Sequence, residues 1–176
     1  MNYNIDPEDY KMDDKFNSSL IYGECDSYNL YTILNKIQNK YNINSFLDVG
    51  SGCGKIIIYL AKNFNHIYFE GVEIQKNRYD KSIKLLNNDK YHFENISFLN
   101  DDFKNLYFGN YDVIYCCNTI FTEEDNDILY NKILNEFKGT FILTTMSCKI
   151  IQYYKEKIMI RSSWHPCIFI YIYNNL

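Results

Sequence analysis

The chain has 176 residues, 47% of them hydrophobic, which is enough for one compact domain with a sizeable core. Its formal net charge of -4 argues against a dedicated nucleic-acid binder, because tight phosphate binding normally needs clustered lysines and arginines. The late segment with Lys149, Lys155, Lys157 and Arg161 could contact an anion, although a solvated face is the simpler interpretation.

The first residues are polar and acidic and lack the apolar core of a secretion signal. No apolar run approaches the ~20 residues that span a bilayer, so we expect a soluble, intracellular protein of the nucleus or cytoplasm. Residues 1–18 read as a loosely ordered arm, and 19–176 as a single domain that acts as a monomer. Six cysteines without a CxxC pair indicate reduced thiols.

Strands and helices are predicted to alternate along the chain. Apolar residues at helical spacing predict a helix from Leu30 to Tyr41, and the short apolar run 45–49 predicts a buried strand before a glycine turn. Helical spacing recurs around 56–64, 79–86 and 130–137, and further strands are expected at 66–74, 95–99, 111–117 and 140–145.

Two late apolar runs, 158–162 and 167–173, lie too close together for a helix to cross between them. They should therefore pair antiparallel as a C-terminal hairpin. The whole pattern predicts an α/β fold with a doubly wound, mostly parallel, seven-stranded Rossmann-like sheet. In such a sheet the ligand binds at the carboxyl ends of the strands.

The turn after the first strand is the sharpest chemical signal. Asp48 precedes Gly50, Gly52 and Gly54 in "DVGSGCG", and a helix follows. Glycines let the backbone approach a ligand closely, but an acid at this place repels a pyrophosphate and attracts an ammonium group. The methionine end of S-adenosyl-L-methionine, which has an ammonium and a carboxylate, therefore suits this turn better than a phosphate.

Two further acids follow the next strands in the positions that an adenosine would need. Glu73 ends the second strand and could accept both ribose hydroxyls. Asp102 follows the third strand and could accept from the adenine amino group, while Phe103 offers a backbone N–H and a stacking face. Each acid alone is more simply a surface residue or a cap, but their order along the strands favours a shared cofactor site.

These motifs resemble the class I S-adenosylmethionine-dependent methyltransferases and, within them, the disruptor-of-telomeric-silencing family of histone-lysine methyltransferases. The resemblance is carried by four stretches over about residues 20–173. They are "YGE" at 22–24, "FLDVGSGCGKIIIYLA" with "GVEIQKNRY", "DDF" with "VIYCCNTIF", and a late "SW" followed by Pro166.

The resemblance implies S-adenosyl-L-methionine as cofactor and assigns a role to each matching residue. Tyr22 and Glu24 would belong to a loop over the cofactor, and Asp48 and Gly50 would hold its methionine end. Glu73 would hold the ribose in this comparison, and Asp102 with Phe103 the adenine.

The same resemblance implies a lysine channel next to the cofactor. Cys117 and Asn118 occupy the place of two paired asparagines at the end of the fourth strand. Trp164 would wall the channel, and Phe169 or Tyr171 would face it, although Trp164 could equally be a core-packing aromatic. Such an apolar channel favours a neutral lysine by desolvation, so no dedicated base is required.

Some residues depart from the family pattern. Cys25 replaces a threonine, Lys55 a glutamine and Cys117 the first asparagine, and we expect neither the family's helical N-terminal region nor its basic tail. The substrate therefore stays open among a core-histone lysine, a lysine of another protein, and no methyl acceptor for a module that only binds the cofactor. The nucleobase alternative is weaker, because Asn118 is followed by neither of the two prolines typical of enzymes that methylate DNA amino groups.

The adjacent Cys116 and Cys117 raise the question of a metal or a redox pair. Neighbouring side chains on a strand point to opposite faces, so the two thiols are badly placed to bind one ion or to form a disulfide with each other. The lip of a reaction pocket is the remaining interpretation of this strand end.

Overall fold

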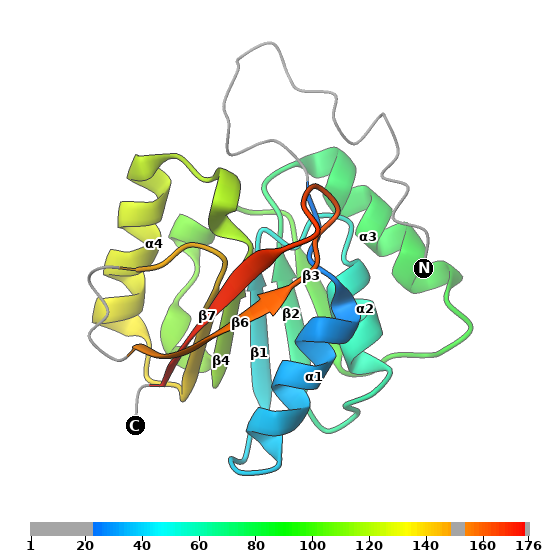
Figure 1. The fold of residues 1–176 in the computed structure, drawn as a ribbon. Coiled ribbons are helices and arrows are strands. Elements are labelled where there is room, and N and C mark those ends of the chain that lie inside the picture. Colours follow the sequence, from blue (N-terminus) through cyan, green and yellow to red (C-terminus); the bar gives the residue numbers. More distant parts are fainter. Residues whose placement is uncertain (1–22, 149–153, 175–176) are drawn as a thin grey trace.

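The computed structural model describes residues 23–148 and 154–174, and its centre is one seven-stranded sheet (Figure 1). The strand order is β3-β2-β1-β4-β5-β7-β6. Neighbouring strands from β3 to β5 are parallel, whereas β7 runs antiparallel to both β5 and β6. The predicted doubly wound sheet with a C-terminal antiparallel hairpin is therefore confirmed. The predicted arm, residues 1–18, lies outside the described residues.

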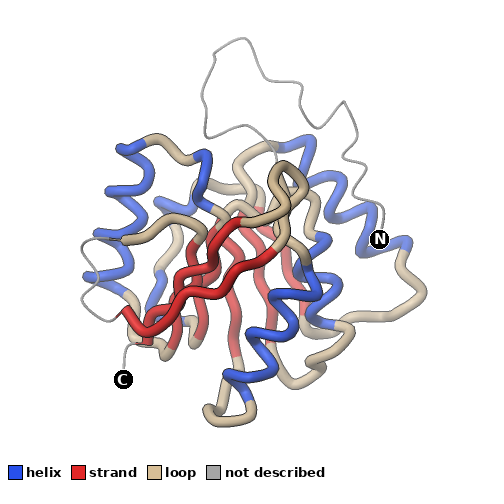
Figure 2. Tube along the Cα trace, viewed as in Figure 1, coloured by secondary structure: helices blue, strands red, loops and turns tan. Residues whose placement is uncertain are grey.

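The elements follow one another along the chain much as the sequence predicts. The strands are β1 (Ser45–Val49), β2 (Tyr68–Val72), β3 (Ile96–Leu99), β4 (Val113–Cys116), β5 (Phe141–Thr144), β6 (Tyr154–Ile160) and β7 (Ile168–Asn174). The helices are α1 (Ser27–Gln38), α2 (Lys55–Ala61), α3 (Lys76–Asn88) and α4 (Glu123–Glu136), with 3-10 turns η3 (Phe103–Asn105), η4 (Phe108–Asn110) and η5 (Asn118–Ile120). In Figure 2 the strands form one continuous layer with helices around it.

Strand β6 starts earlier than the predicted 158. Its first residues are polar and charged, so apolar periodicity does not reveal them, but the backbone of an edge strand needs a partner on one side only. Pairing with β7 extends β6 back to Tyr154, with a register shift between Tyr154 and Glu156.

Alternation along the central strands divides the core between the two faces of the sheet. Phe46 and Tyr115 belong to the cluster under α1 and α2, whereas Leu47 and Cys116 belong to the cluster under α4. Cys117 packs against the first cluster. The two adjacent cysteines therefore lie on opposite faces of the sheet, as period-two geometry requires.

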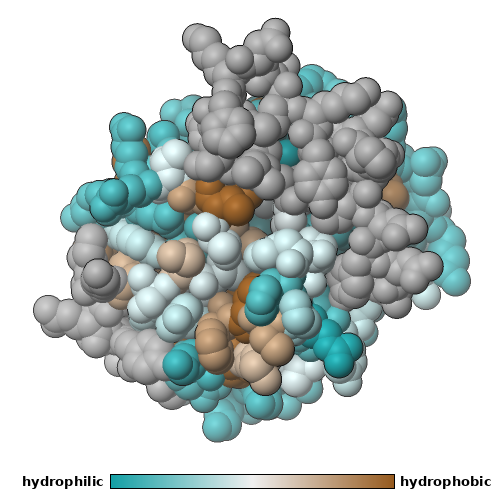
Figure 3. Space-filling model, turned by 45° about the horizontal axis from the view of Figure 1, so that its top comes forward, coloured by the Kyte–Doolittle hydropathy of each residue, from teal (hydrophilic) through white to brown (hydrophobic). Residues whose placement is uncertain are grey.

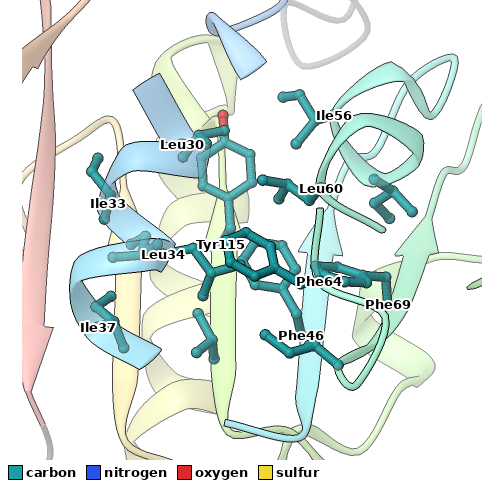
Figure 4. Packing of buried hydrophobic residues seen from close by; sticks show 14 of the residues in the cluster. Leu30, Ile33, Leu34, Ile37, Phe46, Ile56, Leu60, Phe64, Phe69 and Tyr115 are labelled. Atoms are coloured by element: carbon teal, nitrogen blue, oxygen red, sulfur yellow. The ribbon is translucent and has the colours of Figure 1, made fainter. Parts of the chain in front are cut away.

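Helix α1 is held by its cap and by one apolar stripe. The Asp26 carboxylate accepts from the Tyr28 N–H at 2.8 Å and so caps the helix. The buried residues of the stripe are Leu30, Ile33, Leu34 and Ile37. Each contributes about 1.5–3 kcal/mol by leaving water. Figure 4 shows the Tyr115 ring standing between Leu30 of α1 and Leu60 of α2, so this packing fixes the floor of the site.

The outer surface is mixed in character. On the face shown in Figure 3, hydrophilic side chains dominate and the hydrophobic ones form small separate patches. Within the described parts of the chain, no helix combines the length and the apolar character needed to cross a membrane.

Candidate active site

A small pocket lies where β1 and β4 end side by side. Its lining consists of Gly23, Glu24, Cys25, Asp48, Gly50, Ser51, Ile56, Tyr115 and Cys117. The chain leaves β1 into α2 on one face of the sheet and leaves β4 towards α4 on the other face. This topological switch point is where open α/β sheets bind their ligands.

Three left-handed glycines shape the turn between β1 and α2. Gly50, Gly52 and Gly54 have φ values of 79°, 55° and 75°, which side chains with a Cβ adopt only at a cost. The N–H groups of Gly50 and Ser51 donate to the Val72 carbonyl oxygen at 2.9 and 3.0 Å. The turn is thereby fastened to the end of β2, and its residues Gly50 and Ser51 line the pocket.

Glu73 supports the same turn from the end of β2. One carboxylate oxygen accepts from the Gly52 N–H at 2.9 Å, and the other accepts from the Gln75 N–H at 2.8 Å. Burial raises the pKa of Glu73, and these backbone donors oppose that rise. Glu73 is buried and is not part of the pocket lining, so its predicted contact with the ribose stays a prediction.

Asp48 is the most unusual polar residue of the site. Its side chain is 2% exposed, and its Oδ2 atom is buried without a hydrogen-bond partner. Burial, followed by the negative charges of Glu73 and Glu24, raises the pKa of Asp48 well above its usual value. A cationic group entering the pocket would supply the missing partner and stabilise the carboxylate, so this residue fits the ammonium end of an amino-acid cofactor.

An aromatic pair flanks the glycine turn. The Phe103 ring stacks on the Phe121 ring with centroids 5.8 Å apart, and the Phe121 ring lies 3.8 Å from the place where a Gly50 Cβ would stand. The Asp102 carboxylate accepts from the Lys104 N–H at 3.0 Å and caps η3. Asp102 and Phe103, the predicted adenine residues, therefore lie on a short capped turn. The Phe103 ring contacts the Phe121 ring, which in turn lies next to Gly50 of the glycine turn.

Residues 23–26, which we call the strap, run beside the pocket, and Gly23, Glu24 and Cys25 line it. Backbone atoms of Glu24 bond to Ser163 in both directions, at 3.0 and 2.8 Å, and the Asp26 N–H donates to the Arg161 carbonyl oxygen at 3.0 Å. Lys55, at the start of α2, contacts the Glu24 carboxylate at 3.1 Å. Figure 1 shows the strap beside the loop that joins β6 to β7. Tyr22, predicted to belong to this loop over the cofactor, lies outside the described residues.

The two aromatic residues predicted to wall the channel have different neighbours. A Cβ on Gly23 would meet the Trp164 ring at 2.5 Å, so the indole packs directly on the strap backbone. Phe169, on β7, lies beside Tyr171, and Lys157 stands 4.6 Å from the centre of its ring. Trp164 and Phe169 are 41% and 40% exposed, so neither is a core-packing residue. Their channel role stays a prediction.

Asn118 is fully buried and bonded within the protein. Its amide nitrogen donates to Asn126 at 2.6 Å and to the Tyr130 hydroxyl at 2.8 Å. Its carbonyl oxygen accepts from Thr145 and from the Met146 N–H, at 3.0 to 3.3 Å. The side chain joins η5 to α4 and the end of β5. It is not in the pocket lining, so direct contact with a substrate stays a prediction, whereas Cys117 does line the pocket.

Sequence reasoning missed Tyr115, Ser51 and the pairing of Cys25 with Cys117. Alternation along the fourth strand puts Tyr115 on the same face as Cys117, and this signal could have found it. The Cys25 thiol lies 3.6 Å from that of Cys117, a contact between distant segments that no local pattern reveals. Among the described residues, no group of three or more His, Cys, Asp or Glu could hold a metal ion.

Comparisons with known proteins agree with the fold. A sequence search of curated proteins finds no match. Among solved structures, the magnesium protoporphyrin IX methyltransferase ChlM of Synechocystis PCC 6803, with bound SAM, matches with a TM-score of 0.66 and 13% identity, over 84% of this chain and 77% of that chain. The mitomycin 7-O-methyltransferase MmcR matches with a TM-score of 0.58 and 11% identity, over 82% of this chain and 53% of that one.

The match to a sequence family is more specific. Residues 3–163 match the family described as histone methylation protein DOT1, and this range includes the strap, the glycine turn and the end of β4. The chain therefore belongs to the histone methylation protein DOT1 family, within the class I S-adenosylmethionine-dependent methyltransferases.

Proposed function

We propose that this protein transfers a methyl group from S-adenosyl-L-methionine to the side-chain nitrogen of a core-histone lysine. The family match supports the reaction and the histone substrate. The observation that carries the site is the unpartnered, buried oxygen of Asp48 beside a glycine turn, because a cationic ligand in this pocket would supply the missing partner.

The residues of the pocket divide the cofactor among them. Asp48 would accept from the ammonium group, and the backbone at Gly50 would admit the methionine end. Glu73 would accept from the ribose hydroxyls beside the backbone donors Gly52 and Gln75. The Phe103 ring would cover one face of the adenine. When bound, the cofactor supplies a methyl group on a positively charged sulfur.

The protein's own part in the transfer is positioning and desolvation. A neutral amine must approach the methyl carbon in line, at about 3 Å. Cys117, Tyr115 and Ile56 give the pocket weakly polar walls, and Trp164 adds an exposed indole beside the strap. These apolar groups would lower the pKa of an entering lysine, whereas the carboxylates of Asp48 and Glu24 in the same pocket would raise it, so the lysine nitrogen would have to approach on the side of Cys117 and release its proton to solvent before transfer.

The acceptor can be identified with cofactor that carries a radiolabelled methyl group. Nucleosomes, free histones, total cell protein and DNA are offered in parallel to the full chain. The Asp48→Asn variant should lose the signal, and Asp80→Asn, which changes an exposed acid on α3, should keep it. Label on a histone lysine, located by peptide mapping, is the expected result.

Each other outcome revises a different part of the proposal. Label only on other proteins overturns the histone substrate and favours lysine methylation elsewhere. Label on DNA overturns the protein substrate. Measurable cofactor binding without any label indicates a binding module, for which the replacement of an asparagine by Cys117 would be the first cause to examine. Absence of cofactor binding overturns the proposed site itself.

A further inference from the structure

Two thiols meet at the mouth of the pocket. The Cys25 thiol donates to the sulfur of Cys117, with the two sulfur atoms 3.6 Å apart. Cys25 belongs to the strap, Cys117 follows β4, and both line the pocket. A disulfide needs about 2.05 Å between sulfurs, so a shift of about 1.5 Å would join these two segments covalently.

The two cysteines differ in their access to solvent. Cys25 is 1% exposed, whereas Cys117 is half-buried and faces the pocket. The hydrogen bond to Cys117, followed by burial, raises the pKa of Cys25, so Cys25 keeps its proton while the Cys117 sulfur acts as acceptor. An oxidant that enters the pocket would therefore meet Cys117 first, with Cys25 in place to react next.

The strap contacts the rest of the protein in several ways. Its contacts include the backbone bonds to Ser163 and Arg161, the partly exposed contact between Lys55 and Glu24, the Trp164 indole on Gly23 and the buried Cys25 side chain. A cofactor that enters between the strap and the glycine turn requires these contacts to separate for a time. A covalent bond between Cys25 and Cys117 would remove that freedom.

We propose that Cys25 and Cys117 form a reversible disulfide that fastens the strap over the pocket and stops cofactor exchange. The disulfide rests on the sulfur contact alone, whereas its effect on exchange rests on the proposed function of the pocket. The reduced protein then exchanges its cofactor. The oxidised protein does not, and its pocket stays empty or occupied according to its state at the moment of oxidation.

A peroxide is the oxidant class that this chemistry needs. The Cys117 sulfur, as thiolate, attacks one peroxide oxygen, the O–O bond breaks, and hydroxide leaves to become water with one proton. The Cys25 sulfur then attacks the resulting sulfenic acid, the S–O bond breaks, and the departing hydroxide takes the Cys25 proton. For hydrogen peroxide, two thiols and one peroxide give one disulfide and two waters.

Peptide mapping tests the disulfide without reference to activity. The full chain is treated with hydrogen peroxide, its remaining thiols are blocked with N-ethylmaleimide, and its peptides are analysed by mass spectrometry. We expect a linked pair that contains Cys25 and Cys117, which disappears with dithiothreitol. Cys25→Ser and Cys117→Ser should each abolish it, whereas Cys116→Ser, on the opposite face, and Cys167→Ser, at an exposed site, should retain it.

Release of labelled S-adenosyl-L-homocysteine tests the effect on the strap. Oxidation of the complex should slow release at least about tenfold, dithiothreitol should restore it, and Cys25→Ser should make it insensitive to peroxide. Overoxidised Cys117 without a linked peptide overturns the disulfide. A linked peptide together with unchanged release of S-adenosyl-L-homocysteine overturns the proposed block of cofactor exchange. If the reduced protein binds no cofactor, the proposed function and the block fall together, and the linked peptide alone still decides the disulfide.

Discussion

Asp48 is maintained in the free protein at an energetic disadvantage. Its carboxylate is buried, one oxygen has no partner, and the acids Glu73 and Glu24 add to the unfavourable potential. A residue of this kind is retained when a ligand supplies the missing charge, and perturbed acids of this kind gather at functional sites. Removing the charge of Asp48 should therefore weaken cofactor binding without lowering the stability of the free protein.

Asp48→Asn should weaken cofactor binding about tenfold or more, which corresponds to about 1.4 kcal/mol, because the neutral amide cannot pair with an ammonium group. The variant should nevertheless be at least as resistant to heat as the original protein at neutral pH, since the buried charge is gone. Calorimetric titration and thermal unfolding measure the two effects. Unchanged affinity would show that the ammonium lies elsewhere.

Residues at the site differ in how far a sequence can reveal them. Asp48 and the glycines are recognisable because the turn chemistry is local and lies within seven consecutive positions. The contact of Cys25 with Cys117 depends on the path of the strap across the sheet, and Asn118 depends on the position of α4. Interactions that only tertiary packing creates leave no local pattern.

At the scale of elements, the glycine turn offers a matched pair of substitutions. Both Gly50 and Gly54 have positive φ, so alanine costs about 1–2 kcal/mol of backbone strain at either position. At Gly54 the new Cβ would also meet the Phe98 ring at 2.4 Å, whereas at Gly50 the nearest ring atom is 3.8 Å away.

Urea unfolding should therefore show a larger loss of stability for Gly54→Ala than for Gly50→Ala, by about 1–3 kcal/mol of overpacking. The comparison cancels the strain common to the two variants. Equal losses would mean that the Phe98 ring moves aside freely and that the packing of α2 against β3 is looser than its contacts indicate.

The junction of η5, α4 and β5 depends on a single amide. Asn118→Ala removes the five hydrogen bonds of this side chain and leaves buried donors without acceptors. We expect a loss of about 2–4 kcal/mol in urea unfolding. Asn135→Ala, on the exposed side of α4, should stay within about 0.5 kcal/mol. A small loss of stability for Asn118→Ala would mean that Asn118 serves the reaction and not the fold.

The type of an element can be predicted from the sequence where apolar spacing is strong, as in α1 and β1. The first and last residues of an element are harder to predict, because polar and charged residues extend β6 through its pairing with β7 alone. The late segment with Lys149 and Lys155 lies partly outside the described residues, so its interpretation as a solvated face stays a prediction.

For the whole molecule, the buried Asp48 predicts how stability changes with pH. Its folded pKa is raised above the ordinary 3.8, so between the two values the folded chain binds a proton that the unfolded chain has lost. Stability contributed by this group therefore falls as pH rises through that window. Asp48→Asn lacks this dependence.

The Tm difference between Asp48→Asn and the original chain should consequently grow as the pH rises above the ordinary pKa of 3.8. Saturating cofactor should shrink it, because an ammonium partner lowers the pKa of the bound carboxylate. Thermal unfolding over this pH range, with and without S-adenosyl-L-homocysteine, provides the measurement. A difference that stays constant with pH would mean that Asp48 does not titrate in this range.

The order of the sheet also bears on how the chain reaches its native state. The floor of the pocket joins β1 to β4, whose paired residues, such as Asp48 and Tyr115, lie 67 positions apart. Long loops must close before such a pairing forms, and this slows folding. During synthesis, the cofactor can therefore act as a folding ligand only after β4 has left the ribosome, so it cannot stabilise shorter nascent chains.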